Sequence, residues 1–80
     1  MLIENVLFCK VRSGIQDEQI KSSAKNSGLE LVVADEVSRN CLLKFKSMPA
    51  NVATVIKKLA NSMMFTDISF SKNAYVGKVS

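Results

Sequence analysis

The sequence has no histidine, three glycines and only two cysteines, Cys9 and Cys41. Without histidine the chain lacks the usual general base, the commonest metal ligand and the usual pH-sensitive side chain. Two distant cysteines are too few for a structural zinc site, which normally takes four ligands. No glycine-rich phosphate loop is present either. We therefore expect a protein without catalytic activity, metal or cofactor.

Long apolar runs are also missing from the sequence. No segment approaches the roughly 18 apolar residues that a membrane-spanning helix requires. The stretch 1–9 is apolar, but Glu4 and Asn5 interrupt it, and it has neither a basic start nor a small-residue cleavage site. It is therefore not a signal peptide. We expect a cytoplasmic protein with no membrane partner, whose thiols stay reduced.

The chain has 80 residues, about half of them apolar, which predicts one small globular α+β domain over residues 1–80. Eleven Lys and Arg against seven Asp and Glu give a net charge of +4. This balance favours nucleic acid or an acidic protein as partner, although many proteins that bind neither are equally basic. A homodimer would add stability to so small a domain and is compatible with either partner.

A strand is predicted over residues 39–46, because two sets of side chains alternate there. The set expected to face the core is Cys41, Leu43 and Phe45, and the outward set is Leu42, Lys44 and Lys46. The first strand, over residues 2–12, shows the same alternation. Its inward residues are Leu7, Cys9 and Val11, and its outward residues are Val6, Phe8, Lys10 and Arg12.

Two helices and two further strands complete the pattern. Ser13 and Gln16 predict a capping box for a helix from residue 14 or 15 to 27, closed by Gly28. Residues 29–34 predict a strand whose core face carries Leu29, Leu31 and Val33. Ser47 predicts the cap of a second helix, over residues 49–62, with Pro49 in its first turn. The apolar stripe of that helix is Val52, Val55, Ile56, Leu59 and Met63.

The last predicted strand covers residues 64–72. The tail 73–80 then either adds a short fifth strand after a turn at 72–73 or lies loose. The order strand, helix, strand, strand, helix, strand predicts a ferredoxin-like fold, βαββαβ. Right-handed crossovers would place both helices on one face of a four-stranded antiparallel sheet and leave the other face open.

In this arrangement the first and third strands are central neighbours, so Cys9 and Cys41 would both point inward. We interpret them as buried apolar fillers. A redox pair or a metal site has less support, because the chain has no CxxC motif, no histidine and no third ligand.

The open face predicts the candidate site. Phe8, Lys10 and Arg12 on the first strand would lie beside Lys44 and Lys46 on the third. Aromatic stacking combined with basic contacts to phosphate is the physical basis of single-stranded RNA binding on such sheets. The predicted nucleic-acid-binding residues are Phe8, Lys10, Arg12, Arg39, Lys44 and Lys46.

Two other interpretations of the charged surfaces stay open. The open face could be merely solvated, with Phe8 and Leu42 partly covered by the tail or by a second subunit. A second basic surface on the helix side is expected to be only solvated. Its residues are Lys21, Lys25, Lys57 and Lys58.

This layout resembles that of RNA recognition motif domains. The resemblance is one of architecture, since the only residue that matches the family's third-strand signature is the basic one, Arg39. It implies binding of RNA on the open sheet face. Acylphosphatases share the strand order, and Arg12 and Asn40 could be compared with their arginine and asparagine. The glycine- and glutamine-containing loop of that family is missing from residues 11–15, however.

The leading hypothesis is a small non-catalytic module that binds RNA or single-stranded nucleic acid through the basic sheet face. The alternative is a protein-interaction module, such as an antitoxin, a regulator or a phage-encoded inhibitor of a host complex. Its motivation is the small chain without catalytic groups, together with apolar residues that could lie exposed. Those residues are Phe8, Leu42, Tyr75 and Val76.

Overall fold

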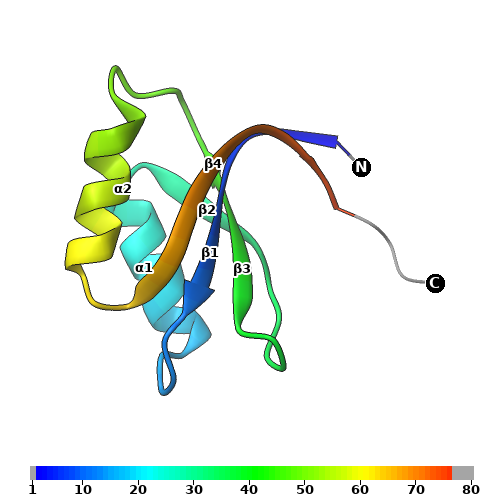
Figure 1. Ribbon diagram of the computed structural model, residues 1–80, viewed down its shortest axis with the longest axis vertical. Coiled ribbons are helices and arrows are strands. Elements are labelled where there is room, and N and C mark those ends of the chain that lie inside the picture. Colours follow the sequence, from blue (N-terminus) through cyan, green and yellow to red (C-terminus); the bar gives the residue numbers. More distant parts are fainter. Residues whose placement is uncertain (1, 77–80) are drawn as a thin grey trace.

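The computed structural model describes residues 2–76 and contains six elements. They are β1 (Leu2–Val11), α1 (Asp17–Asn26), β2 (Leu29–Ala34), β3 (Asn40–Phe45), α2 (Val52–Asn61) and β4 (Phe65–Tyr75). The strands form an antiparallel sheet in the order β2-β3-β1-β4. Both helices cover one face of this sheet (Figure 1). The predicted ferredoxin-like fold, with β1 and β3 at the centre, is confirmed.

The main core lies between the sheet and the helices. The inward residues of β1 and β3 are those that the alternation predicts, and each of them is buried. Ile20 and Ala24 of α1 and Leu59 of α2 pack on them from the helix layer, with Phe65 at the start of β4. Each Å² of apolar surface that these side chains remove from water stabilises the fold by roughly 25 cal/mol. This burial is the main source of stability.

Both helices begin later than predicted, because amide side chains and not serines cap them. Gln16 caps α1, and its backbone N–H donates to Oε1 of Gln19 over 2.9 Å. Asn51 caps α2, where its Oδ1 accepts a hydrogen bond of 3.0 Å from the N–H of Ala53. The predicted caps at Ser13 and Ser47 are therefore wrong. Gly28 follows α1 with a positive φ of 75°, as predicted.

Two side chains predicted in the core lie outside it. The β2–β3 register shifts between Leu31 and Val33, so Val33 lies opposite Leu42 and is 46% exposed. An extra residue in one strand reverses the inward and outward sets beyond it, and Ala34 packs on the main core instead. Met63 leaves the helical path with φ 66° and is 66% exposed.

The tail does not turn at residues 72–73. Instead β4 continues to Tyr75 and pairs with the start of β1, with Ala74 opposite Ile3. Residues 73–75 therefore extend β4, and the described chain has four strands and no fifth. The rest of the predicted tail strand, residues 77–80, lies outside the described residues.

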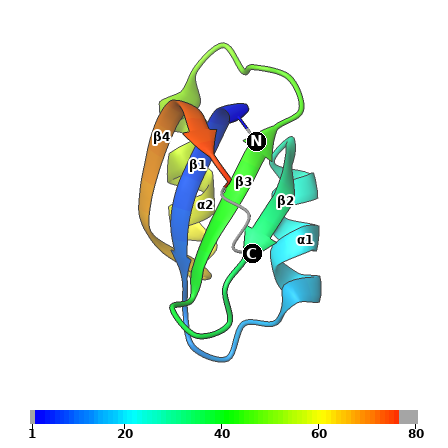
Figure 2. The same ribbon diagram turned by 90° about the vertical axis from the view of Figure 1, so that its right-hand side faces the viewer.

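The first residues of β1 and the last of β4 bend together over the open face of the sheet (Figures 1 and 2). The bend coincides with Asn5, which has a positive φ of 58°. Asparagine tolerates this conformation better than most residues. Beyond the bend the inward and outward sets no longer match those of the central sheet, and Ile3 reaches the open face.

Under this bend lies a second apolar cluster, which we call the open-face cluster. Its buried members are Ile3, Val6, Leu42 and Ala74, and Val32 and Val76 pack against it. Leu42 is only 5% exposed, whereas Phe8, its neighbour across the strands, is 43% exposed. The interpretation in which the C-terminal part of the chain covers Leu42 is the one observed.

Candidate nucleic-acid interface

The uncovered part of the open face lies where β1 ends and β3 begins, away from the bend (Figure 2). Residues directly opposite one another in an antiparallel sheet share a face, and successive rows are about 7 Å apart. Two such rows cross β3, β1 and β4 here: Leu42–Phe8–Ser69 and Asn40–Lys10–Thr66. An exposed aromatic ring and an ammonium group thus occupy adjacent positions at the centre of the sheet.

Arg12 follows these rows in the segment that leaves the sheet. Its backbone N–H donates to the carbonyl of Met64 over 2.9 Å, which fixes the segment against the start of β4. The side chains of Arg12 and Lys10 line a shallow surface depression together with Thr66. We call this set the Phe8 patch, and its members are the exposed residues Phe8, Lys10, Arg12, Asn40 and Ser69 with the half-buried Thr66.

Arg39 lies beside the Phe8 patch, but its guanidinium already serves the fold. One terminal nitrogen donates to the carbonyl oxygens of Arg12, at 3.0 Å, and Ile15, at 2.7 Å. Its Nε is buried and has no hydrogen-bond partner in the part of the chain that the structure describes. Arg39 also has a positive φ of 64°. Because of these contacts, the Arg39 side chain stabilises the loop after β1 and is not free to bind phosphate. We call this role of Arg39 a brace.

Lys44 and Lys46 lie towards the other end of β3. Lys44 is half-buried and lies between Val6 and Glu30, so a carboxylate faces it across the strands. Lys10 lies opposite Asn40, four residues before Lys44, which places the two lysines about 13 Å apart along the sheet. Lys46 is farther still. The structure therefore brings together Phe8, Lys10 and Arg12 but not all six predicted residues.

Sequence reasoning missed the polar residues of the Phe8 patch that β4 supplies. A bulge between Phe8 and Lys10 on the β1–β4 ladder moves Thr66 and Ser69 into the two rows, and Asp67 has φ 53° within it. An aspartate within a strand is a weak sign of such a bulge, because aspartate tolerates a positive φ better than most residues. Asp67 is exposed near Lys10 and reduces the positive potential of the patch.

Cys9 and Cys41 lie opposite each other on β1 and β3, and both side chains are buried. The Cys9 thiol hydrogen-bonds to Cys41, and this bond, helped by the positive charge of Arg39, lowers the pKa of Cys41 against the effect of burial. The same hydrogen bond raises the pKa of Cys9, and burial raises it further. The predicted inward placement of both cysteines is confirmed.

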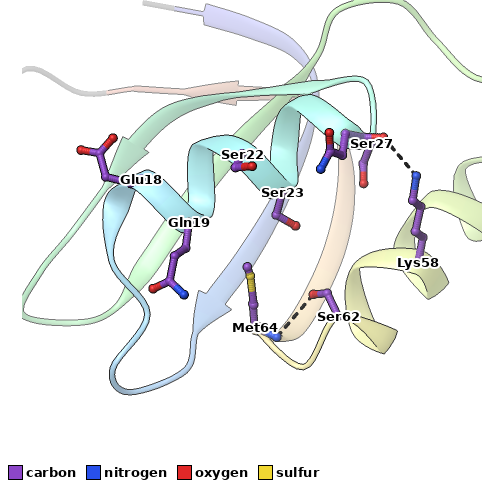
Figure 3. A pocket seen from close by; sticks show the side chains of 9 residues that line it. Glu18, Gln19, Ser22, Ser23, Ser27, Lys58, Ser62 and Met64 are labelled. Carbon is purple, nitrogen blue, oxygen red and sulfur yellow. Dashed lines mark hydrogen bonds between the residues drawn. The ribbon is translucent and has the colours of Figure 1, made fainter.

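The helix side holds a second hollow, a groove of about 560 Å³ between α1 and α2 (Figure 3). Polar side chains of α1 line one wall, and Lys58 crosses to donate to the carbonyl of Asn26 over 3.0 Å. Met64 forms part of the lining as well. The groove contains one bridging cation and no aromatic side chain among its lining residues. It offers fewer features for nucleic acid than the Phe8 patch does.

Comparison with protein-family models, curated proteins and solved structures gives no match for this chain. Within residues 2–76, no helix is long and apolar enough to cross a bilayer. The same residues contain no cluster of three or more His, Cys, Asp or Glu side chains that could hold a metal ion. The site must therefore be interpreted from its own geometry.

Proposed function

We propose that this protein is a non-catalytic cytoplasmic module that binds RNA or other single-stranded nucleic acid through the Phe8 patch. The observation that supports it is the position of Phe8, a 43% exposed aromatic ring at the centre of the sheet with Lys10 in the adjacent row. Single exposed apolar side chains are common on protein surfaces, so what favours binding is the place of this ring beside the cationic side chains of Lys10 and Arg12. An exposed ring flanked by cations suits a stacked base and its phosphate.

The proposed binding uses two kinds of contact. The face of Phe8 stacks on one base, which contributes about 1–3 kcal/mol by comparison with alanine and requires no particular base. Lys10 and Arg12 neutralise the neighbouring phosphates, and Asn40 and Ser69 can hydrogen-bond to base edges or to a ribose hydroxyl. The covered end of the face, with the open-face cluster, limits the bound stretch to a few nucleotides.

Fluorescence anisotropy with short labelled single-stranded RNA and DNA, at low salt, tests the proposal. Phe8→Ala should weaken binding about 5- to 150-fold, in line with the loss of one stacked base. Phe8→Tyr should retain most of the affinity, since it keeps an aromatic face, whereas Phe8→Leu should not. This series separates stacking from simple apolar contact.

The control for charge is a double reversal on the helix layer. Lys10→Glu with Arg12→Glu and Lys21→Glu with Lys57→Glu change the net charge equally, but only the first pair alters the Phe8 patch. Binding should be abolished by the first pair and largely retained by the second. Equal losses from both pairs, or no binding by the unaltered protein, would overturn the proposal.

A protein-interaction module is the second candidate, and the β2 edge favours it. β2 is an outer strand of the sheet, Val33 on it is 46% exposed, and Val37 in the following turn is 93% exposed. An uncovered strand edge with apolar side chains is a ready template for another strand. The simplest occupant is a second copy of this chain.

Light scattering tests this second candidate. The protein should have the mass of a dimer, and Val33→Lys should convert it to a monomer because a lysine there would oppose its counterpart across the new strand pair. Tyr75→Lys, at the opposite sheet edge and 81% exposed in the native protein, is the control and should leave the dimer intact. A monomeric unaltered protein at high concentration would refute β2 pairing.

A further inference from the structure

The two cysteines are a pair of nucleophilic side chains that the Phe8 patch does not use. They are register partners on the two central strands, and the β3 partner, Cys41, lies two residues after Arg39. Directly opposite residues in antiparallel strands have Cα atoms about 4.5–5.5 Å apart, within the range of about 4.4–6.8 Å that a disulfide spans. The register of the two strands is therefore compatible with a disulfide between the pair.

We propose that Cys9 and Cys41 are a redox-sensitive pair that closes into a reversible cross-strand disulfide when the protein meets hydrogen peroxide. Both thiols are free and buried in the structure described here. Both side chains belong to the main core between the sheet and the helices. Peroxide therefore reaches the sulfurs when the packing of this core opens locally.

The surroundings assign different roles to the two sulfurs. Arg39 lies near Cys41, and its buried Nε has no hydrogen-bond partner among residues 2–76, so an anionic sulfur would be stabilised by this positive charge. The hydrogen bond from Cys9 also favours a thiolate at Cys41, and the pKa of Cys41 is lowered accordingly. Thiolates, not thiols, are the nucleophiles. Cys41 is therefore the attacking residue and Cys9 the resolving residue.

The reaction has two steps. The Cys41 thiolate attacks one peroxide oxygen, the O–O bond breaks, and the sulfur becomes a sulfenic acid while the other oxygen leaves as water after taking a proton. The Cys9 sulfur then attacks the Cys41 sulfur, forms the S–S bond, and a second water leaves. Overall, two thiols and one peroxide give one disulfide and two waters, and a dithiol reductant restores both thiols.

Intact-mass spectrometry of the folded chain tests this reaction after brief treatment with hydrogen peroxide and alkylation in denaturant. The protein should lose two hydrogens, form no covalent link between chains without reductant and take up no alkyl group, and dithiothreitol should restore two alkylation sites. A peptide digest should show one linked pair that contains Cys9 and Cys41. Two free thiols after treatment, or links only between chains, would overturn the proposal.

Single substitutions separate the roles of the two sulfurs. In Cys9→Ser the reaction should stop at a sulfenic acid on Cys41, which dimedone captures. In Cys41→Ser the remaining Cys9 should react at least tenfold more slowly with both peroxide and alkylating agent. Circular dichroism should confirm that both variants are folded, since serine in place of a buried thiol lowers stability. Equal reactivity of the two variants would contradict the assigned roles.

Discussion

The two ends of the open sheet face carry similar sequence patterns but have opposite environments. At one end Val6 is buried beneath the bent parts of β1 and β4, with Leu42 buried at the boundary, and at the other end Phe8 and Lys10 are exposed. The segments beyond the bend near Asn5 supply this cover through Ile3 and Ala74. A strand pattern thus shows which residues share a face, but whether that face is covered depends on segments distant in the sequence.

The covered end can be compared directly with the main core, because Leu42 and Leu43 are neighbours on β3 that point to opposite faces. Leu43→Ala should lower the free energy of unfolding by about 4 kcal/mol, and Leu42→Ala by about 2–3 kcal/mol, since truncated buried leucines cost 2–5 kcal/mol. Leu43 is 0% exposed and Leu42 is 5% exposed. Urea denaturation followed by circular dichroism measures both changes.

A cost below about 1 kcal/mol for Leu42→Ala would contradict a cover that stays in place, because such a value is typical of a half-exposed side chain. Ile3→Ala provides a second measure of the same cover from the opposite strand. If the cover stays in place, Ile3→Ala should lower the free energy of unfolding as Leu42→Ala does. Neither substitution should disturb the helix layer, whereas Leu43→Ala should. Hydrogen exchange of α2 amides distinguishes the two cases.

The structure at the exposed end of the sheet face is stabilised by hydrogen bonds from Arg39, whereas the covered end is stabilised by apolar packing. Arg39→Met keeps the length of the side chain but removes its hydrogen bonds to the carbonyls of Arg12 and Ile15. Hydrogen bonds that involve a charged group contribute about 1.5–3 kcal/mol, so a loss of about 2 kcal/mol in unfolding free energy is expected. Amides of residues 12–15 should also exchange faster. Unchanged exchange there would show that the brace is dispensable.

Much of the fold follows from the sequence because it rests on local alternation and helical spacing. The strand order, the inward residues of β1 and β3 and the stripe of α2 except Met63 were predictable in this way. Three features were not, namely the bulge at Val33, the continuation of β4 to Tyr75 and the bend near Asn5. Each depends on how one strand meets another, which no local pattern records.

The same limit applies to the candidate site. Alternation placed Phe8 and Lys10 on one face correctly, but it could not show that Arg39 turns to brace a loop. Nor could it show that Glu30 lies opposite Lys44. Both facts come from pairing between segments far apart along the chain. These two pairings reduce the candidate site from the six predicted residues to those at the uncovered end of the sheet. Binding of nucleic acid there stays a prediction.

The salt dependence of binding distinguishes the lysines at the two ends. Each phosphate contact on a single strand contributes about 0.7 to the slope of log affinity against log salt concentration. Lys10→Gln should lower the magnitude of that slope by about this amount, whereas Lys44→Gln should leave it nearly unchanged. The slopes come from anisotropy titrations at several salt concentrations. The reverse ranking would move the interface to the covered end.

The smallest expected effect concerns the β2–β3 turn, which borders the exposed end. The carboxylate of Asp35 accepts a 2.9 Å hydrogen bond from the backbone N–H of Val37, and this bond, together with the Ser38 hydroxyl, lowers the pKa of Asp35. Because this pKa is lower in the folded state, the charged carboxylate stabilises the turn at pH values above the pKa of the unfolded chain, about 3.9. This stabilisation is lost as the pH falls through the pKa of the folded state. An NMR titration should therefore show Asp35 protonating below about pH 3.9, with the Val37 amide shifting in parallel. Asp35→Asn, which keeps an acceptor oxygen without the charge, should remove the pH dependence. A midpoint at or above the ordinary value would show that the hydrogen bonds of the turn do not stabilise the Asp35 carboxylate.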